Sequence, residues 1–202
     1  MPLPSERIGE IESLAEEMLK NHWNKKLPVN IEDIARFQKF DVQSREFPDP
    51  DDSGFILVDD DTYIGETGFH RIIAVNSALS EERARFVVAH ELGHFTLHRQ
   101  PDEPLYAHKE SREEEDITPE MEQEADLFAR ALLMSRQLMR NAFQIYKEKA
   151  PVDSIVYFIS RIFGVTEKKA AIRIQETVET VGTIGTVGSA GTVVLEEAHA
   201  TG

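Results

Sequence analysis

An almost continuous apolar stretch from Ala84 to Leu97 carries two histidines and a glutamate at its centre. His90 and His94 stand four residues apart and Glu91 directly follows the first, which is the HExxH spacing. Residues four apart on a helix share one face, with β-carbons about 5–6 Å apart, so two imidazoles can converge on one ion. Each of these polar groups would cost about a few kcal/mol if buried without a partner. The stretch therefore predicts a buried helix with a metal site; the alternative is two hydrogen-bonded core histidines.

The chain contains no cysteine, which excludes disulfide bonds and thiolate metal sites and leaves His, Asp and Glu as side-chain ligands. Catalytic zinc needs three protein ligands and one open position, so a third donor must come from another segment. His98 lies one turn beyond His94 and roughly 12 Å along the helix axis from His90, too far for all three to bind one ion. We therefore expect His98 to lie behind the ligands or in the core.

Candidates for the third ligand lie on a helix that should start at Thr118 and Pro119, a capping hydroxyl followed by proline. Its acidic residues are Glu120, Glu122, Glu124 and Asp126. Glu124 is our first choice, because it flanks the apolar stripe that must pack inward. Glu122 is the second choice, since it is nearer the first turn, where acids favour the helix dipole. We expect Asp126 to orient His90 or His94 as a hydrogen-bond acceptor.

The remaining pattern predicts an α+β fold. Apolar residues at helical spacing indicate two helices near the start, the second capped by Asn30, and short β-branched runs between Phe40 and Val75 indicate a small antiparallel sheet of about three strands. The helix that carries the histidines should start at Ser80, a capping residue followed by two acids, and end near His98. After it, the acidic segment from Arg99 to Ile117 should be a loop, and the next helix should reach Met139 or further. We assign residues 1–150 to one domain, 151–179 to a helical hairpin packed on it, and 180–202 to a flexible tail rich in Gly, Thr and Val.

The net charge of −15, from 37 acidic against 22 basic side chains, would repel phosphate backbones. We therefore expect no direct nucleic-acid binding, whereas a basic protein would be attracted. No apolar run approaches the roughly 20 residues needed to cross a bilayer, so we expect no membrane association. The polar, acidic start also predicts a cytoplasmic protein.

The segments RARFVVAHELGHFTLH and EADLFARALLM, with LPVNIEDIA and DSGFI before them, resemble the ImmA/IrrE family of bacterial metallopeptidases over roughly Leu14 to Ile174. The resemblance implies a zincin-like fold with a gluzincin-like site, in which His90, His94 and Glu124 hold Zn²⁺ and Glu91 is the catalytic base. Ser135 stands where the family usually has proline, a difference expected to affect only how the helix continues.

These observations favour a zinc endopeptidase. The family resemblance suggests that the substrate is a regulatory protein, such as a DNA-binding repressor or an antitoxin, cleaved in stress response or in mobile-element or toxin control. The oxyanion partner is left open among His98, Tyr106, His108 and Tyr146. The cleavage sequence, any activating trigger and the oligomeric state are also left open.

Two other functions compete with this hypothesis. The hairpin resembles a helix-turn-helix with four basic residues, Arg161, Lys168, Lys169 and Arg173, so the chain could be a zinc-containing binding or sensor module, or a transcription regulator with little proteolytic activity. Its apolar residues are explained more simply by packing against the rest of the chain. The third possibility is zinc-dependent hydrolysis of something other than a protein.

Overall fold

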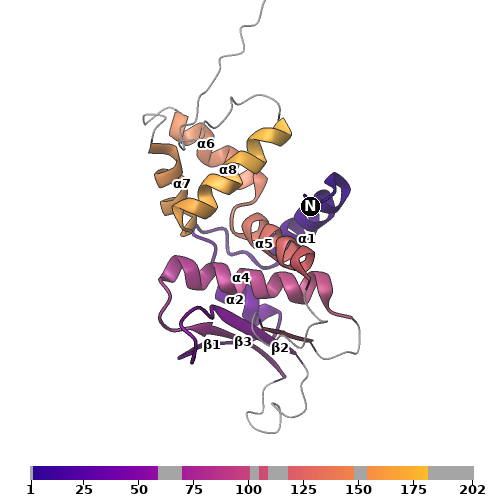
Figure 1. The fold of residues 1–202 in the computed structure, drawn as a ribbon. Coiled ribbons are helices and arrows are strands. Elements are labelled where there is room, and N and C mark those ends of the chain that lie inside the picture. Colours follow the sequence, from indigo (N-terminus) through magenta and orange to yellow (C-terminus); the bar gives the residue numbers. More distant parts are fainter. Residues whose placement is uncertain (1, 59–69, 101–104, 109–117, 148–153, 182–202) are drawn as a thin grey trace, which may run out of the picture.

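The computed structural model describes residues 2–58, 70–100, 105–108, 118–147 and 154–181. Figure 1 labels the elements in chain order. They are α1 (Ser5–His22), α2 (Ile31–Phe37), β1 (Asp41–Arg45), β2 (Gly54–Val58), β3 (Arg71–Asn76), α4 (Glu81–His98), β4 (Leu105–His108), α5 (Pro119–Leu133), α6 (Arg136–Lys147), α7 (Ile155–Phe163) and α8 (Glu167–Val181). The predicted α+β class is confirmed, and the arrangement is compatible with a zincin-like fold. Within these ranges, no helix combines the length and apolar character that spanning a membrane requires.

The sheet differs from the expected antiparallel one. Its four strands in the described part of the chain lie in the order β1-β3-β2-β4, with β1 parallel to β3 and the other two pairs antiparallel. Strand β1 pairs with β3, which is distant from it in sequence. The alternation of apolar and polar residues within a strand does not reveal which strand is its partner. The fourth strand falls inside the segment from Arg99 to Ile117 that was expected to be a loop; the rest of that segment, 101–104 and 109–117, lies outside the described residues.

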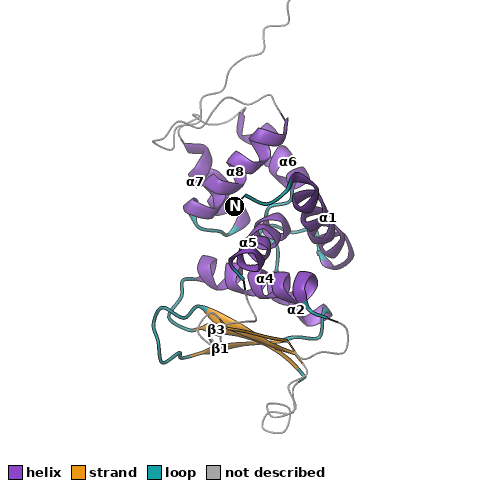
Figure 2. Cartoon of the chain, turned by 45° about the vertical axis from the view of Figure 1, so that its right-hand side comes forward, coloured by secondary structure: helices purple, strands orange, loops and turns teal. Residues whose placement is uncertain are grey.

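The elements are stacked in layers with α4 at the centre. Helix α4 covers one face of the sheet, and α5 lies on the opposite side of α4 (Figure 1). Figure 2 shows the same order from another direction, with α1 beside α5 and the group α6 to α8 farther from the sheet. Because the sheet and α5 cover opposite sides of α4, Ala89 and Leu92 are completely buried and His94 nearly so. The apolar character around this helix follows from its central position.

The predicted helix starts are confirmed by their caps. The side chains of Asn30, Ser80 and Thr118 each accept a hydrogen bond from the backbone N–H three residues later. The predicted continuation of α5 to Met139 is wrong, because the helix ends at Leu133 and α6 begins at Arg136.

A glycine ends the first helix of the hairpin. Gly164 has φ 60° and ψ 47°, the left-handed conformation in which α7 ends. Helix α8 continues beyond the predicted end at residue 179 to Val181, and the flexible tail predicted for the rest of 180–202 lies outside the described residues from 182 onward.

Helix α8 is joined to α1 by a buried ion pair. Arg173 is 1% exposed, and its Nη1 donates to Glu12 Oε1 at 2.7 Å while its Nε donates to the carbonyl oxygen of Met134 at 2.9 Å. The division into a domain at 1–150 and a hairpin at 151–179 stays a prediction. The contact with α1 nevertheless couples the hairpin to the start of the chain.

Gly93 fixes how closely α4 and α5 approach. A β-carbon at this position would lie 3.0 Å from Ala125 Cα and 3.1 Å from the Ala125 carbonyl oxygen, closer than backbone atoms tolerate without moving. The two small residues therefore let the helix backbones come together at the level of His90 and His94. Larger residues at either position would separate the helices.

We expect Gly93→Ala to lower the free energy of unfolding by about 1–3 kcal/mol, because the added methyl group must push α5 away from α4. Gly9→Ala is the matched control, since Gly9 lies in α1 with nothing within 4 Å of an added β-carbon. That control should raise stability by about 0.5–1 kcal/mol through helix propensity alone. Urea denaturation of both variants measures the difference, and equal effects would contradict the close contact.

Candidate active site

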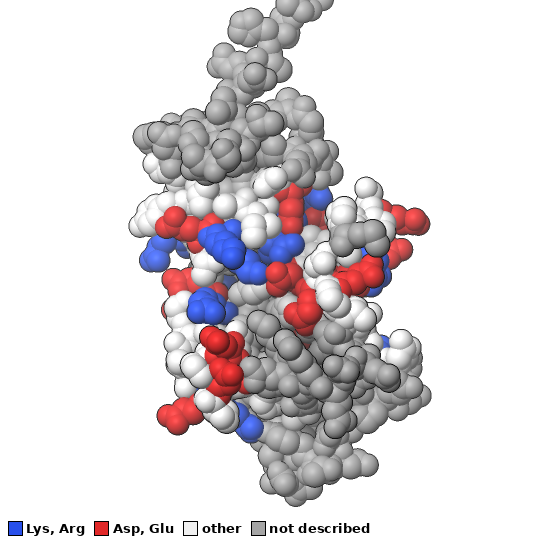
Figure 3. All heavy atoms as spheres, in the orientation of Figure 1, with Lys and Arg blue, Asp and Glu red and all other residues white. Residues whose placement is uncertain are grey.

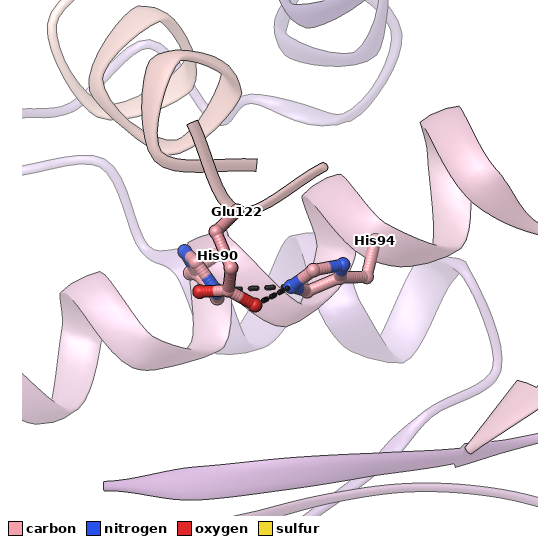
Figure 4. A group of neighbouring side chains, drawn as sticks. All are labelled: His90, His94 and Glu122. Atoms are coloured by element: carbon pink, nitrogen blue, oxygen red, sulfur yellow. Dashed lines mark hydrogen bonds and ion pairs between the residues drawn. The ribbon is translucent and has the colours of Figure 1, made fainter. Parts of the chain in front are cut away.

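His90 and His94 converge on the side of α4 that faces α5. Their Nε2 atoms are 3.0 Å apart, and the two carboxylate oxygens of Glu122 lie 3.2 Å from His94 Nε2 and 3.5 Å from His90 Nε2. Figure 4 shows Glu122 reaching from α5 toward both rings. The three side chains can offer donor atoms that all lie within 4.8 Å of one another, the arrangement needed to hold a metal ion.

The expectation that Glu124 completes this group is not met by the geometry. Arg7 of α1 donates two hydrogen bonds to the Glu124 carboxylate, at 2.7 and 2.6 Å, and His98 Nε2 lies 3.0 Å from Glu124 Oε2. Helix α5 packs between α4 and α1, and two residues along a helix turn a side chain by roughly 200°. Glu124 therefore lies at the junction of α1 with the last turn of α4, away from the two ligand candidates.

A packing signal in the sequence could have identified Glu122. It lies three residues before Ala125, so both are on the same face of α5. Ala125 is the small residue that meets Gly93, one residue before His94. The face of α5 that carries small residues is the face that α4 approaches, and an acid on that face, one turn earlier, can reach the histidines.

Both histidine rings have a second partner on the nitrogen that points away from Glu122. His90 Nδ1 lies 3.2 Å from Asp126 Oδ1, which places Asp126 where an orienting acceptor was expected. His94 Nδ1 lies 3.1 Å from His98 Nδ1, so His98 stands behind His94 and outside the convergent group. Lys169 of α8 donates to Asp126 Oδ2 at 2.9 Å, a contact that sequence reasoning missed because it joins distant segments.

Glu91 is buried beside the histidines. It is 6% exposed, and among the described residues its Oε2 has no hydrogen-bond partner. Burial, reinforced by the nearby negative charge of Glu122, raises the pKa of Glu91 to about 8, despite the opposing effect of His90. A buried carboxyl group with a raised pKa beside two convergent histidines is suited to accept a proton.

The electrostatics of the cluster favour positive charge between its donors. Burial alone would lower the pKa of His90, but hydrogen bonds to Asp126 and Glu122 outweigh it and raise the pKa to about 10. Hydrogen bonds from His90 and His94 hold the pKa of Glu122 well below its usual range. Burial lowers the pKa of His94. The carboxylates thus stabilise a cation on one imidazole, and a divalent ion would meet the same field.

A cleft of about 550 Å³ opens onto the cluster. Its walls come from the start of β2 at Gly54, from α4 and α5, and from the start of α8, where Thr166, Lys168 and Lys169 line it. Figure 3 shows lysine and arginine side chains gathered across the middle of one face, between groups of acids. Because Lys168 and Lys169 belong to α8, this helix forms part of the cleft wall, a placement that the sequence did not indicate.

The side chains of two of the four oxyanion candidates, His98 and Tyr146, are buried. His98 is behind His94 and is 5% exposed. Tyr146 is buried against Phe158, with ring centroids 4.7 Å apart, and is not among the described residues that line the cleft. The side chains of Tyr106 and His108 lie outside what the structure describes.

Comparison with known proteins places the chain in a family. A search of curated proteins gave no match. The family model Peptidase_M78, described as the IrrE N-terminal-like domain, matches residues 34–175, a range that contains α4, α5 and the convergent group. The family is one of metallopeptidases, which implies a metal ion and a protein substrate. Since the match covers well over half of the 202 residues, the chain belongs to the Peptidase_M78 family, the ImmA/IrrE metallopeptidases.

Proposed function

We propose that this protein is a zinc-dependent endopeptidase, with His90, His94 and Glu122 as metal ligands and Glu91 as general base. The observation that carries the proposal is the convergence of these groups: the two Nε2 atoms are 3.0 Å apart, and Glu122 places Oε1 3.2 Å from His94 Nε2 and Oε2 3.5 Å from His90 Nε2. Zn²⁺ bound tetrahedrally at 2.0–2.1 Å from its ligands separates neighbouring donors by about 3.3 Å. Three such ligands leave the fourth position open, as catalysis requires.

The donor types also fit zinc. The set contains two imidazole nitrogens and one carboxylate, and the chain has no thiol that would make a different kind of site. The contact of Asp126 with His90 Nδ1 leaves the Nε2 lone pair directed at the other ligands. The residues present therefore suit a bound Zn²⁺.

Bound in this position, Zn²⁺ would act as a Lewis acid toward the scissile carbonyl and toward water. Glu91 is the residue of this chain that moves the proton. Its carboxylate, which lines the cleft, accepts a proton from the attacking water and delivers it to the leaving amine nitrogen. Burial of Glu91 matches this role, because a pKa near 8 lets the carboxyl group both take up and release a proton near neutral pH.

The substrate in this proposal is a regulatory protein with a basic surface, such as a DNA-binding repressor or an antitoxin, cleaved in stress response or in mobile-element or toxin control. The net charge of −15 supports it, because opposite charge speeds the encounter of enzyme and substrate. The family resemblance supports the regulatory role. We propose that the protein acts in the cytoplasm, where such regulators bind DNA.

The helical hairpin gives less support to the competing DNA-binding function. Arg173 is directed into the interior toward Glu12, and Lys169 pairs with Asp126. Arg161 lies 3.8 Å from Glu82. Three of the four basic residues expected to favour DNA thus have acidic partners within the protein, which weighs against contact with a phosphate backbone.

Zinc binding distinguishes the two candidate third ligands. Glu122→Gln should weaken zinc binding by at least about 100-fold, since even loss of an outer contact to a ligand typically costs about 10–100-fold. Glu124→Gln is the matched control on the same helix and should stay within about tenfold of the wild type. Competition with a chromophoric chelator measures both dissociation constants, and the reverse order would reinstate Glu124 as the ligand.

Replacement of the base should separate metal binding from hydrolysis. Glu91→Gln should bind zinc with an unchanged 1:1 stoichiometry while cleavage falls by about 10²–10⁴-fold, because the proton acceptor is lost. The measurement is cleavage of a basic DNA-binding regulator, with and without a chelator, followed by mass spectrometry. Chelator-resistant cleavage, or full activity of Glu91→Gln, would refute the mechanism.

A further inference from the structure

His98 ends α4 directly behind a proposed ligand. Its side chain is 5% exposed and lies between two polar groups, with Nδ1 3.1 Å from His94 Nδ1 and Nε2 3.0 Å from Glu124 Oε2. Arg7 holds the same Glu124 carboxylate through two nitrogens, at 2.7 and 2.6 Å. Four side chains therefore form a continuous hydrogen-bonded row from the interior to the partly exposed Arg7.

When a metal is bound, one placement of the histidine ring protons gives each hydrogen bond in this row one donor and one acceptor. If His94 Nε2 is a ligand, its ring proton is on Nδ1 and points at His98. His98 Nδ1 must then accept, so the proton of a neutral His98 is on Nε2 and is donated to the Glu124 carboxylate. Arg7 supplies only donors, which match the remaining lone pairs of Glu124.

We propose that His98 is a positioning residue that fixes the ring orientation and tautomer of His94 for metal binding, and that Glu124 and Arg7 anchor it. The inference rests on the proposed function, since it takes His94 as a ligand. His98 accepts a hydrogen bond from His94 Nδ1 in the way that Asp126 accepts one from His90 Nδ1. Unlike the carboxylate of Asp126, a neutral imidazole adds no negative charge behind the ligand. Arg7 belongs to α1, which lies outside the matched family region, so a helix beyond that region supports the proposed site.

Zinc affinity tests the proposal without measuring catalysis. His98→Leu should weaken zinc binding by about 10–100-fold, the usual effect of losing a partner behind a ligand. His98→Asn should recover most of the affinity, because its side-chain oxygen occupies the position of Nδ1 and can accept from His94. Chelator competition measures both variants, and thermal unfolding of each without metal shows whether it is folded.

The same assay separates this inference from the proposed function. His90→Ala should abolish tight zinc binding; if it does not, the proposed ligand set fails. If His90→Ala behaves as expected but His98→Leu keeps wild-type affinity, only the role of His98 is refuted.

The protonation pattern can be read directly in the zinc-loaded wild type. Long-range ¹H–¹⁵N spectra should show His98 as a neutral ring protonated on Nε2, with its signal assigned by its loss in His98→Asn. His94 should be protonated on Nδ1. A His98 ring protonated on Nδ1, or on both nitrogens, would overturn the proposal even if the Leu variant did not fold.

A separate observation concerns the charges along the cleft wall. Among the described lining residues, the acids are Glu91, Glu122 and Asp126, and even with all three ionised their negative charge does not exceed the positive charge of Lys169 plus one divalent ion. Arg83 and Lys168 line the same cleft, are exposed, and form no ion pair with any residue in the described ranges. The zinc-loaded cleft therefore retains two uncompensated cations.

We infer that Arg83 and Lys168 select a peptide with an acidic side chain close to the scissile bond, an inference that also rests on the proposed peptidase activity. Both are placed on the walls of the cleft that leads to His90 and His94, one from α4 and one from α8. A regulator that is basic on its DNA-facing side carries its acidic residues elsewhere. Selection of an acidic segment would direct cleavage to that part of the substrate.

A peptide library made by digesting a bacterial proteome tests this selection, with chelator-sensitive cleavage sites identified by mass spectrometry. Asp and Glu should be enriched at one or more positions near the cleaved bond. Arg83→Glu combined with Lys168→Glu should replace that enrichment by Lys and Arg, while Arg36→Glu, on the exposed surface of α2, should not. Cleavage without acidic enrichment, or enrichment unchanged by the double substitution, refutes the inference, whereas no chelator-sensitive cleavage counts against the peptidase function itself.

Discussion

The close approach of α4 and α5 at Gly93 and Ala125 is the contact on which the proposed site depends. The histidines belong to one helix and Glu122 to the other, so the donor spacing is set by the distance between two backbones. Only residues as small as glycine and alanine allow that distance. A metal site built between rigid packed helices holds its donors in place before the ion binds, which reduces the cost of ordering them.

Two acids only two residues apart have different roles because α5 has two neighbours. Glu122 faces α4 and meets the histidine nitrogens, whereas Glu124 is held at the junction with α1 by Arg7 and His98. The ion pair with Arg7 holds the pKa of Glu124 below its ordinary value, so the carboxylate stays charged where it accepts hydrogen bonds. The helix thus contributes one carboxylate to the proposed metal site and another to its support.

Local signals predicted the parts of the fold that local interactions determine. Helix starts at Asn30, Ser80 and Thr118 were predictable, because a capping side chain bonds within its own turn. The pairing of β1 with β3 was not predictable, because parallel neighbours are joined through distant segments. Strand β4 was missed because it lies in a mainly polar segment. The placement of Glu122 and Glu124 likewise depends on which faces of α5 meet α4 and α1, and the apolar stripe of α5 does not distinguish these two neighbours.

The two histidines are supported from opposite ends of the chain. Lys169 of α8 holds Asp126 behind His90, while Arg7 of α1 holds Glu124 and, through it, His98 behind His94. The buried pair of Arg173 with Glu12 joins these two terminal helices to each other. The side chains that contact the proposed ligands from behind are therefore held by α1 and α8, and both helices contact α5. An ion that binds this assembled arrangement and not the unfolded chain adds its binding free energy to folding, so metal affinity and the stability of the whole fold are thermodynamically linked.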